Sequence, residues 1–108
     1  MASKVQSAAI GAAGALVSQT FRDVFNAAII NSAALVGTVV LEKSYDRATV
    51  ANDGAATWNA VSKDATGAAL SFTTFPVNIQ INEPEIGVYY RWNCTAYTSG
   101  SATGRLSQ

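Results

Sequence analysis

Residues 87–99 read GVYYRWNCTAYTS, and their side chains alternate between two kinds. One set is mainly apolar: Val88, Tyr90, Trp92, Cys94 and Ala96. The other set, the polar stripe, consists of Tyr89, Arg91, Asn93, Thr95 and Tyr97. Because successive side chains of a strand point to opposite faces, the pattern predicts a strand with the apolar set in a core. The Ser-Gly-Ser sequence at 99–101 is typical of a turn, so residues 102–107 are expected to return as the last strand of a hairpin.

Shorter stretches of the same kind precede this one. Strands are expected at 36–45, 57–62, 68–74 and 77–82, and the segments between them are rich in residues typical of turns. Residues 20–31 fit either an irregular strand or a short helix followed by a strand. About seven short strands separated by turns are typical of a sandwich or small barrel. We therefore predict an all-β fold in which residues 19–108 form a single β-sandwich, Ig-like or jelly-roll-like.

The segment 1–18 is rich in Ala and Gly and poor in bulky side chains. Gly11 and Gly14 weaken any helix there. We expect an extended N-terminal arm over residues 1–18 that lies against a neighbouring chain through Ile10, Leu16 and Val17. The alternative is a short helix that caps the sheet of its own domain. The apolar run is too short and too weakly hydrophobic to cross a membrane, so the protein is expected to be made in the cytoplasm.

The composition excludes several classes of function. The 108 residues include seven basic and seven acidic side chains, and charged residues make up only 13%. A nucleic-acid-binding domain usually carries a basic patch, so nucleic acid is not the expected partner. A net charge of zero favours association instead. The absence of histidine removes the commonest general base and metal ligand, and we expect no catalytic, metal or cofactor site.

Two groups of acidic and amide side chains are candidates for a chemical site. Glu83 and Glu85 lie two residues apart in a loop, where keeping the loop solvated is a simpler role than that of a glycosidase pair. Asp46, Asn52 and Asp53 offer oxygen ligands, but their spacing does not match a calcium loop. Local turn chemistry is the expected role of all three.

The stretches SYD at 44–46 and DGAATW at 53–58 together resemble an Asp-box, the Ser-x-Asp-x-Gly-x-Thr-Trp hairpin of sialidases. Several residues are inserted before Gly54 if the Ser44 and Asp46 half is used. The resemblance implies a β-hairpin with a structural turn and no catalytic role.

The polar stripe is the one candidate binding site. It offers two aromatic rings, a guanidinium and an amide, and Tyr and Arg are enriched in protein interfaces. We predict a protein interface there. Packing within the chain and binding of a glycan are the alternatives.

Four segments carry a wider resemblance: GTVVLEKSYD at 37–46, TW at 57–58, YRWNCTAYTSG at 90–100 and RLSQ at 105–108. They resemble small β-sandwich virion proteins of tailed bacteriophages. These share a Gly-Thr-Val-x-Leu-x-x-Ser-x-Asp strand, a Thr-Trp pair and a Tyr-Arg-x-x-Cys-x-x-Tyr-x-Ser-Gly hairpin. The resemblance covers residues 36–108, and residues 46–53 look like an insertion.

This resemblance implies a non-enzymatic capsid decoration or cement protein located in the virion. The implied partners are the major capsid protein or another virion protein, together with further copies of the chain, with a trimer as the expected oligomer. The alternative is a carbohydrate- or receptor-binding module of a phage fibre or tail.

Overall fold

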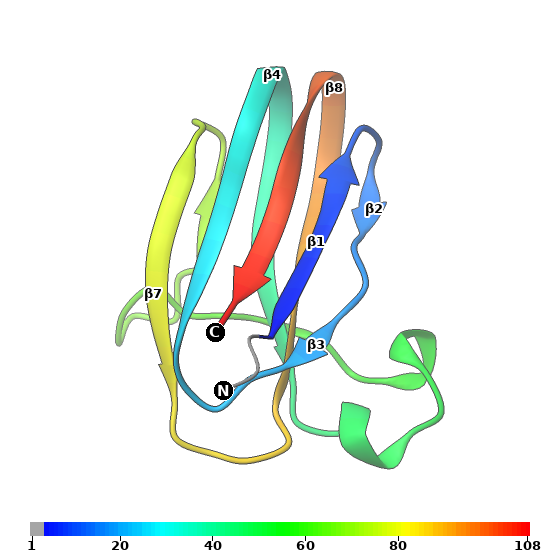
Figure 1. Ribbon diagram of the computed structural model, residues 1–108, viewed down its shortest axis with the longest axis vertical. Coiled ribbons are helices and arrows are strands. Elements are labelled where there is room, and N and C mark those ends of the chain that lie inside the picture. The colour runs from blue at the N-terminus through cyan, green and yellow to red at the C-terminus, as the bar shows by residue number, and fades with distance from the viewer. Residues whose placement is uncertain (1–3) are drawn as a thin grey trace.

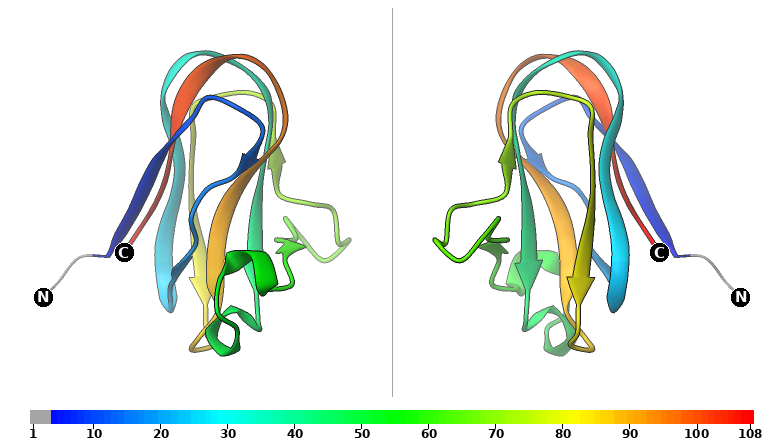
Figure 2. Two further views of the ribbon diagram at one scale, coloured as in Figure 1. Left: turned by 90° about the vertical axis from the view of Figure 1, so that its right-hand side faces the viewer. Right: turned by 90° about the vertical axis from the view of Figure 1, so that its left-hand side faces the viewer.

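The computed structural model describes residues 4–108, which form two facing layers of antiparallel strands (Figures 1 and 2). The strands are β1 (Val5–Ile10), β2 (Gly14–Ala15), β3 (Gln19–Thr20), β4 (Asp23–Ser44), β5 (Asn59–Ala60), β6 (Ser71–Phe72), β7 (Val77–Glu83) and β8 (Tyr89–Ser107). Two short 3-10 helices, η1 (Arg47–Thr49) and η2 (Asp53–Ala55), interrupt the loop after β4. The all-β prediction is confirmed. Within residues 4–108, no helix has the length and apolar character needed to cross a membrane.

Two long strands belong to both layers. β4 has 22 residues and β8 has 19. A straight strand of β4's length would span about 70 Å at about 3.3 Å per residue, but the longest dimension of the domain is 36 Å. Both strands therefore fold over, at Asn31 (φ 52°) and Ala34 (φ 54°) in β4 and at Gly100 (φ 81°) in β8. Figure 2 shows this fold at one end of the molecule, where the two strands cross together from one layer to the other.

Each layer contains one half of each long strand. The first layer runs β7, the first half of β4, the second half of β8, and β1. The second layer runs β5 and β6, the second half of β4, the first half of β8, and then β2 and β3. All of these strands belong to one hydrogen-bonded sheet.

Two expectations about strand boundaries are wrong. The strands expected at 20–31 and 36–45 are mostly one strand, β4. The hairpin expected at 99–101 does not form, because residues 102–107 pair with β1 and the first half of β4 in the opposite layer. Gly100 allows this path by its positive φ and by a close approach, since a Cβ there would lie 2.2 Å from the carbonyl oxygen of Ala34.

The core lies between the layers and contains four of the five residues of the apolar set predicted from the alternation. The fifth, Ala96, is exposed, because one extra residue in β8 before it reverses the alternation. Tyr90 and Trp92 are each 1% exposed, and Val88 and Cys94 are also buried. The ring of Phe25 packs edge-on against Tyr90 at 4.7 Å between centroids. Burying a large apolar side chain contributes roughly 1.5–3 kcal/mol, so the two layers hold together mainly through this cluster.

A buried polar group lies at the edge of this core. Glu83 is 4% exposed, and its carboxylate accepts a hydrogen bond of 2.6 Å from the Tyr90 hydroxyl. The Lys43 ammonium lies 3.6 Å from the same carboxylate oxygen. Burial and the neighbouring carboxylate raise the pKa of Tyr90, so its hydroxyl stays protonated as a donor. A buried carboxylate is tolerated when it is paired in this way.

The segment 4–18 is part of the sheet of its own domain, so it is neither the expected arm lying against a neighbouring chain nor the alternative capping helix. β1 pairs with the end of β8 from Val5 opposite Ser107 to Ile10 opposite Ala102, and β2 and β3 continue along the same strand. The expected boundary at residue 18 therefore does not separate two parts. Residues 1–3 of the expected arm lie outside the described residues.

Candidate interaction surface

The first half of the polar stripe lies on the outer face of the second layer, under the loop 45–58. The Arg91 guanidinium donates to Glu42 at 2.8 Å and lies 4.1 Å from the centroid of the Trp58 ring, a cation–π contact. The Asn93 amide donates to the other oxygen of Glu42 at 3.2 Å. With its side chain 15% exposed, Arg91 is engaged within the chain and is not available as an interface anchor.

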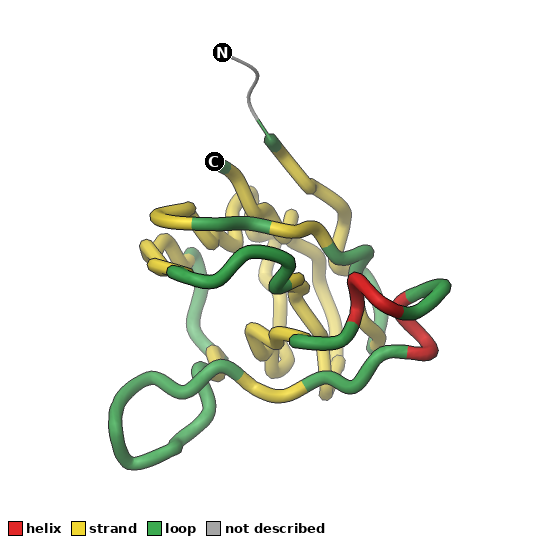
Figure 3. Tube along the Cα trace, turned by 90° about the horizontal axis from the view of Figure 1, so that it is seen from below, coloured by secondary structure: helices red, strands yellow, loops and turns green. Residues whose placement is uncertain are grey.

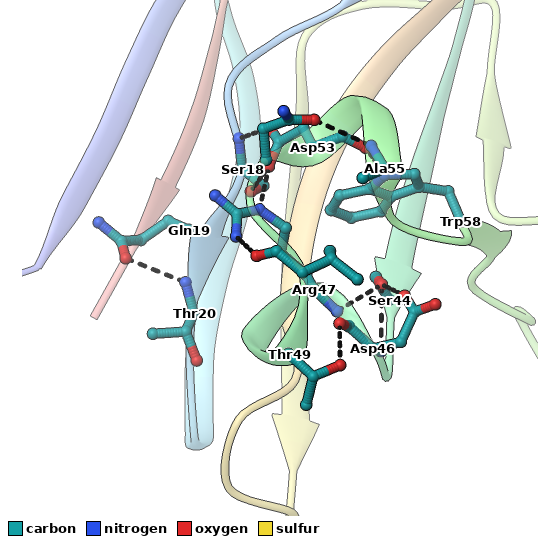
Figure 4. A network of polar contacts seen from close by, with 12 residues as sticks. Ser18, Gln19, Thr20, Ser44, Asp46, Arg47, Thr49, Asp53, Ala55 and Trp58 are labelled. Carbon is teal, nitrogen blue, oxygen red and sulfur yellow. Dashed lines mark hydrogen bonds and ion pairs between the residues drawn. The ribbon is translucent and has the colours of Figure 1, made fainter.

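The loop 45–58 is tied down by Asp53 (Figure 4). The carboxylate of Asp53 accepts hydrogen bonds from Arg47 (2.6 Å) and from the hydroxyl and backbone N–H of Ser18 (2.6 and 3.0 Å). Burial raises the pKa of Asp53, but the hydrogen bonds from Ser18 and Arg47 outweigh it and hold the pKa below its usual value. The guanidinium of Arg47 also lies 5.2 Å from the ring of Tyr89, so this ring is covered as well. Seen from below in Figure 3, the two short helices of the loop lie to one side of the strands.

The two halves of the Asp-box-like sequence meet despite the insertion. Asp46 accepts hydrogen bonds from the Ser44 hydroxyl at 2.7 Å and from the backbone N–H of Thr57 at 2.9 Å. These donors lower the pKa of Asp46. The indole of Trp58 donates to the backbone oxygen of Asp53 at 2.9 Å. The acidic residues of this loop thus hold its turns, and residues 4–108 contain no cluster of acidic or cysteine side chains able to hold a metal ion.

The second half of the polar stripe is divided by a bulge. Val39 pairs with Cys94 and Thr38 with Ala96, which leaves Thr95 as an extra residue in β8. An extra residue reverses the alternation that follows it. Tyr97 therefore turns inward, packs against the core and donates to the backbone oxygen of Gly100 at 2.8 Å. Only Thr95 stays exposed, so the five residues do not form one surface.

The three residues expected to bind a neighbour through the arm are also separated. Ile10 is 2% exposed in the core. Leu16 is half-buried against it, in the space left by Gly104, where a Cβ would lie 2.6 Å from the Leu16 Cδ1. Val17, at 63% exposed, is the only one of the three on the surface. The prediction that Ile10 contacts a neighbouring chain is therefore wrong, because Ile10 lies in the core of its own domain.

The two loop carboxylates do not form a catalytic pair. One oxygen of Glu83 accepts from Tyr90, and the other accepts from the backbone N–H of Glu85 at 3.0 Å. Glu83 is thus a buried, fully engaged group, while Glu85 is exposed. The two carboxylates do not face each other across an open site of the kind that glycoside hydrolysis needs.

A second outer surface, the outer face of the first layer, was missed by sequence reasoning. No loop of residues 4–108 crosses in front of its strands in Figure 1. A shallow depression of about 290 Å³ lies there, lined by Asn26, Ala28, Ile30, Asn78, Arg105 and Ser107. We call this surface the open face. The guanidinium of Arg105 makes no hydrogen bond or ion pair with any of residues 4–108, so its charge is free for a ligand or partner.

The sequence indicates only one part of the open face. The alternation of Asn78, Gln80 and Asn82 with apolar residues in β7 marks one polar edge of the face. The other members come from strands far apart in the sequence: Asn26 lies in β4 and pairs with Ser107 of β8. Only the tertiary pairing assembles them.

No protein-family model, curated protein or solved structure matches this chain.

Proposed function

We propose that this chain is a non-enzymatic structural protein of a bacteriophage virion, a decoration or cement protein that binds the capsid shell through its open face. The proposed class of particle rests on the resemblance of residues 36–108 to small virion proteins of tailed phages. The major capsid protein is the proposed partner, and the virion is the proposed location.

The observation that carries this proposal is the contrast between the two outer faces. On the second layer, the loop 45–58 covers Tyr89 and Arg91 and uses their side chains in contacts within the chain. On the first layer, small, amide and aliphatic side chains surround Arg105, the one cation among the described residues that lines the depression. A stable protein interface takes about 800 Å² from each partner. A broad, low-relief surface such as this one suits a protein shell better than a small molecule.

The carbohydrate-binding alternative is less well supported by the side chains. It relied on the rings of Tyr89 and Tyr97 and on Arg91. The first ring lies under Arg47, the second packs inward, and Arg91 is held by Glu42. The residues that line the depression include no aromatic side chain on which a sugar could stack.

The test is co-sedimentation with capsids of the phage that encodes the chain, prepared without it. Arg105→Glu reverses the free charge on the open face and is expected to weaken binding at least tenfold. Lys63→Glu makes the same change of charge on an exposed loop and is the matched control, expected to bind as the wild type does. Equal binding by both variants would refute docking through the open face. Absence of capsid binding together with a positive glycan array would replace the proposal with the carbohydrate-binding alternative.

A further inference from the structure

The outer edge of β1 presents a regular row of unpaired backbone groups. Lys4 and Gln108 exchange both of their backbone hydrogen bonds, at 3.1 and 2.8 Å. Such pairs alternate along an antiparallel ladder. Within the unbroken register of β1 and β8, the backbone of Gln6, Ala8 and Ile10 therefore faces β8. The N–H and C=O groups of Val5, Ser7 and Ala9 point away from it, and no other segment of residues 4–108 pairs with them.

This edge lacks the features that usually protect an edge strand. Natural edges are guarded by charged side chains, proline or a bulge. No charged residue or proline occurs between Val5 and Phe21, and the register of β1 is continuous. The nearest charge, Lys4, is directed elsewhere, because its ammonium donates to the backbone oxygen of Thr20 at 2.8 Å. The exposed side chains of Val5, Ser7 and Ala9 are small and uncharged, so a second strand can approach without a clash of charge or bulk.

We propose that this edge binds a second copy of the chain by antiparallel pairing of β1 with β1, about a twofold axis through Ser7. In this register Ser7 lies opposite Ser7 of the second copy, and Val5 lies opposite Ala9. All three residues with outward backbone groups then form pairs that exchange two hydrogen bonds each. A register shifted by two residues in either direction leaves one of the three without a partner. The edge is thus complementary to itself in one register.

The twofold axis is perpendicular to the first layer. The outer faces of the two copies therefore lie on the same side of the joined sheet. The two first layers join into one continuous sheet whose central strands are the two copies of β1. Because the contact uses the same edge on both copies, it closes at a dimer. This differs from the trimer implied by the phage resemblance. The pairing does not depend on the proposed capsid binding.

The first experiment measures the mass in solution by light scattering over a concentration series. The wild type is expected to be a dimer at micromolar concentration. Ser7→Pro removes a donor that points outward and leaves the bonds to β8 intact, so a folded monomer is expected. Ser7→Thr keeps the N–H and is the control, expected to remain dimeric. A wild type that stays monomeric at about 100-fold higher concentration, or a folded Ser7→Pro dimer as stable as the wild type, would overturn the inference.

A second experiment tests the register and does not depend on the folding of the proline variant. Cα atoms of a hydrogen-bonded pair lie about 5.5 Å apart, within the span of about 4.4–6.8 Å that a disulfide bridges. Ser7→Cys is therefore expected to form a covalent dimer on mild oxidation. Val5→Cys is the control, because the two copies of Val5 would lie about 13 Å apart along the strands. The natural Cys94 is buried and does not interfere. Equal cross-linking of both variants, or none, would refute this register.

The two proposals fail separately. A cross-linked dimer that does not bind capsids would refute the proposed function and leave the β1 contact standing. A monomer that binds capsids would refute the β1 contact and leave the proposed function standing.

Discussion

Replacing Gly100 with alanine is expected to destabilise the whole domain, because this residue lies where β8 folds from one layer into the other. Its φ of +81° is unfavourable for any residue with a Cβ. The added methyl would also lie 2.2 Å from the carbonyl oxygen of Ala34 and 2.7 Å from that of Ala33. Both atoms belong to the backbone of β4 at its own bend, so neither can rotate away as a flexible side chain would.

The magnitude follows from two separate costs. Holding alanine at a left-handed φ costs about 1–2 kcal/mol. Forcing a methyl group into a closely packed site costs a further 1–3 kcal/mol, roughly. The sum of about 2–5 kcal/mol is a large part of the stability of a small domain. At about 4–8 °C per kcal/mol, the midpoint of thermal unfolding should fall by roughly 8–40 °C.

Two other glycines provide matched controls for the same substitution. Gly67 has the same φ of +81° but no atom within 4 Å of its added Cβ, so Gly67→Ala should show the backbone cost alone. Gly11 has neither a positive φ nor a close neighbour, and Gly11→Ala should be neutral or slightly stabilising. Urea and thermal unfolding of the three variants would measure the series. If Gly100→Ala were no less stable than Gly67→Ala, the close approach of the two bends would not constrain the fold, and the reasoning would be refuted.

Two further predictions concern the polar groups. Tyr90→Phe leaves the buried Glu83 carboxylate without its 2.6 Å hydrogen bond and should lower the free energy of unfolding by about 1–3 kcal/mol; a change within the error of denaturant titration would contradict this. Asp53 has a pKa held below 3.8 in the folded chain, so the stability it contributes is present at neutral pH and is lost as the pH falls from about 5 through the folded pKa. Asp53→Asn should therefore flatten the loss of stability between pH 6 and pH 3 relative to the wild type, and identical pH profiles in urea unfolding would argue against the role of Asp53 in holding the loop.

The strand pattern could be predicted where it depends on local alternation. Val88, Tyr90, Trp92 and Cys94 are buried as their spacing indicates. The prediction of Tyr97 on the same face as Arg91 failed, because one extra residue at Thr95 reverses the faces. A bulge is defined by the partner strand, and the local sequence does not mark it.

The bends of the long strands show a second limit. Ser-Gly-Ser at 99–101 has the composition of a turn, and a glycine with positive φ does lie there. Whether the chain then returns beside itself or continues into another layer depends on β4, whose Asn31 and Ala34 bend at the same level. No residue of β8 carries that information alone.

The N-terminal segment was misjudged for a related reason. Few bulky residues looked insufficient to anchor residues 1–18. In the fold, Gly104 leaves a space that Leu16 fills, and Ile10 enters the same part of the core. Two apolar side chains are enough to anchor the segment because a glycine in β8 leaves space for them. That glycine lies more than eighty residues away in the sequence. The open face escaped prediction because its residues also come from distant strands.

The passage of β4 and β8 through both layers has a consequence for the order of folding. Their pairing joins Ser44 to Tyr89 at one end and Asn26 to Ser107 at the other, so every contact between them closes a long stretch of chain. Residues 102–107 of β8 lie between β4 and β1 and pair with both. No other strand connects β1 to β4 in this layer. The N-terminal strand therefore has no place to dock until the last part of β8 has been synthesised. This domain should therefore fold in a single cooperative step once β8 is complete, on the millisecond-to-second scale typical of distant β pairings. Chains cut short before the end of β8 should expose the unpaired edges of both layers.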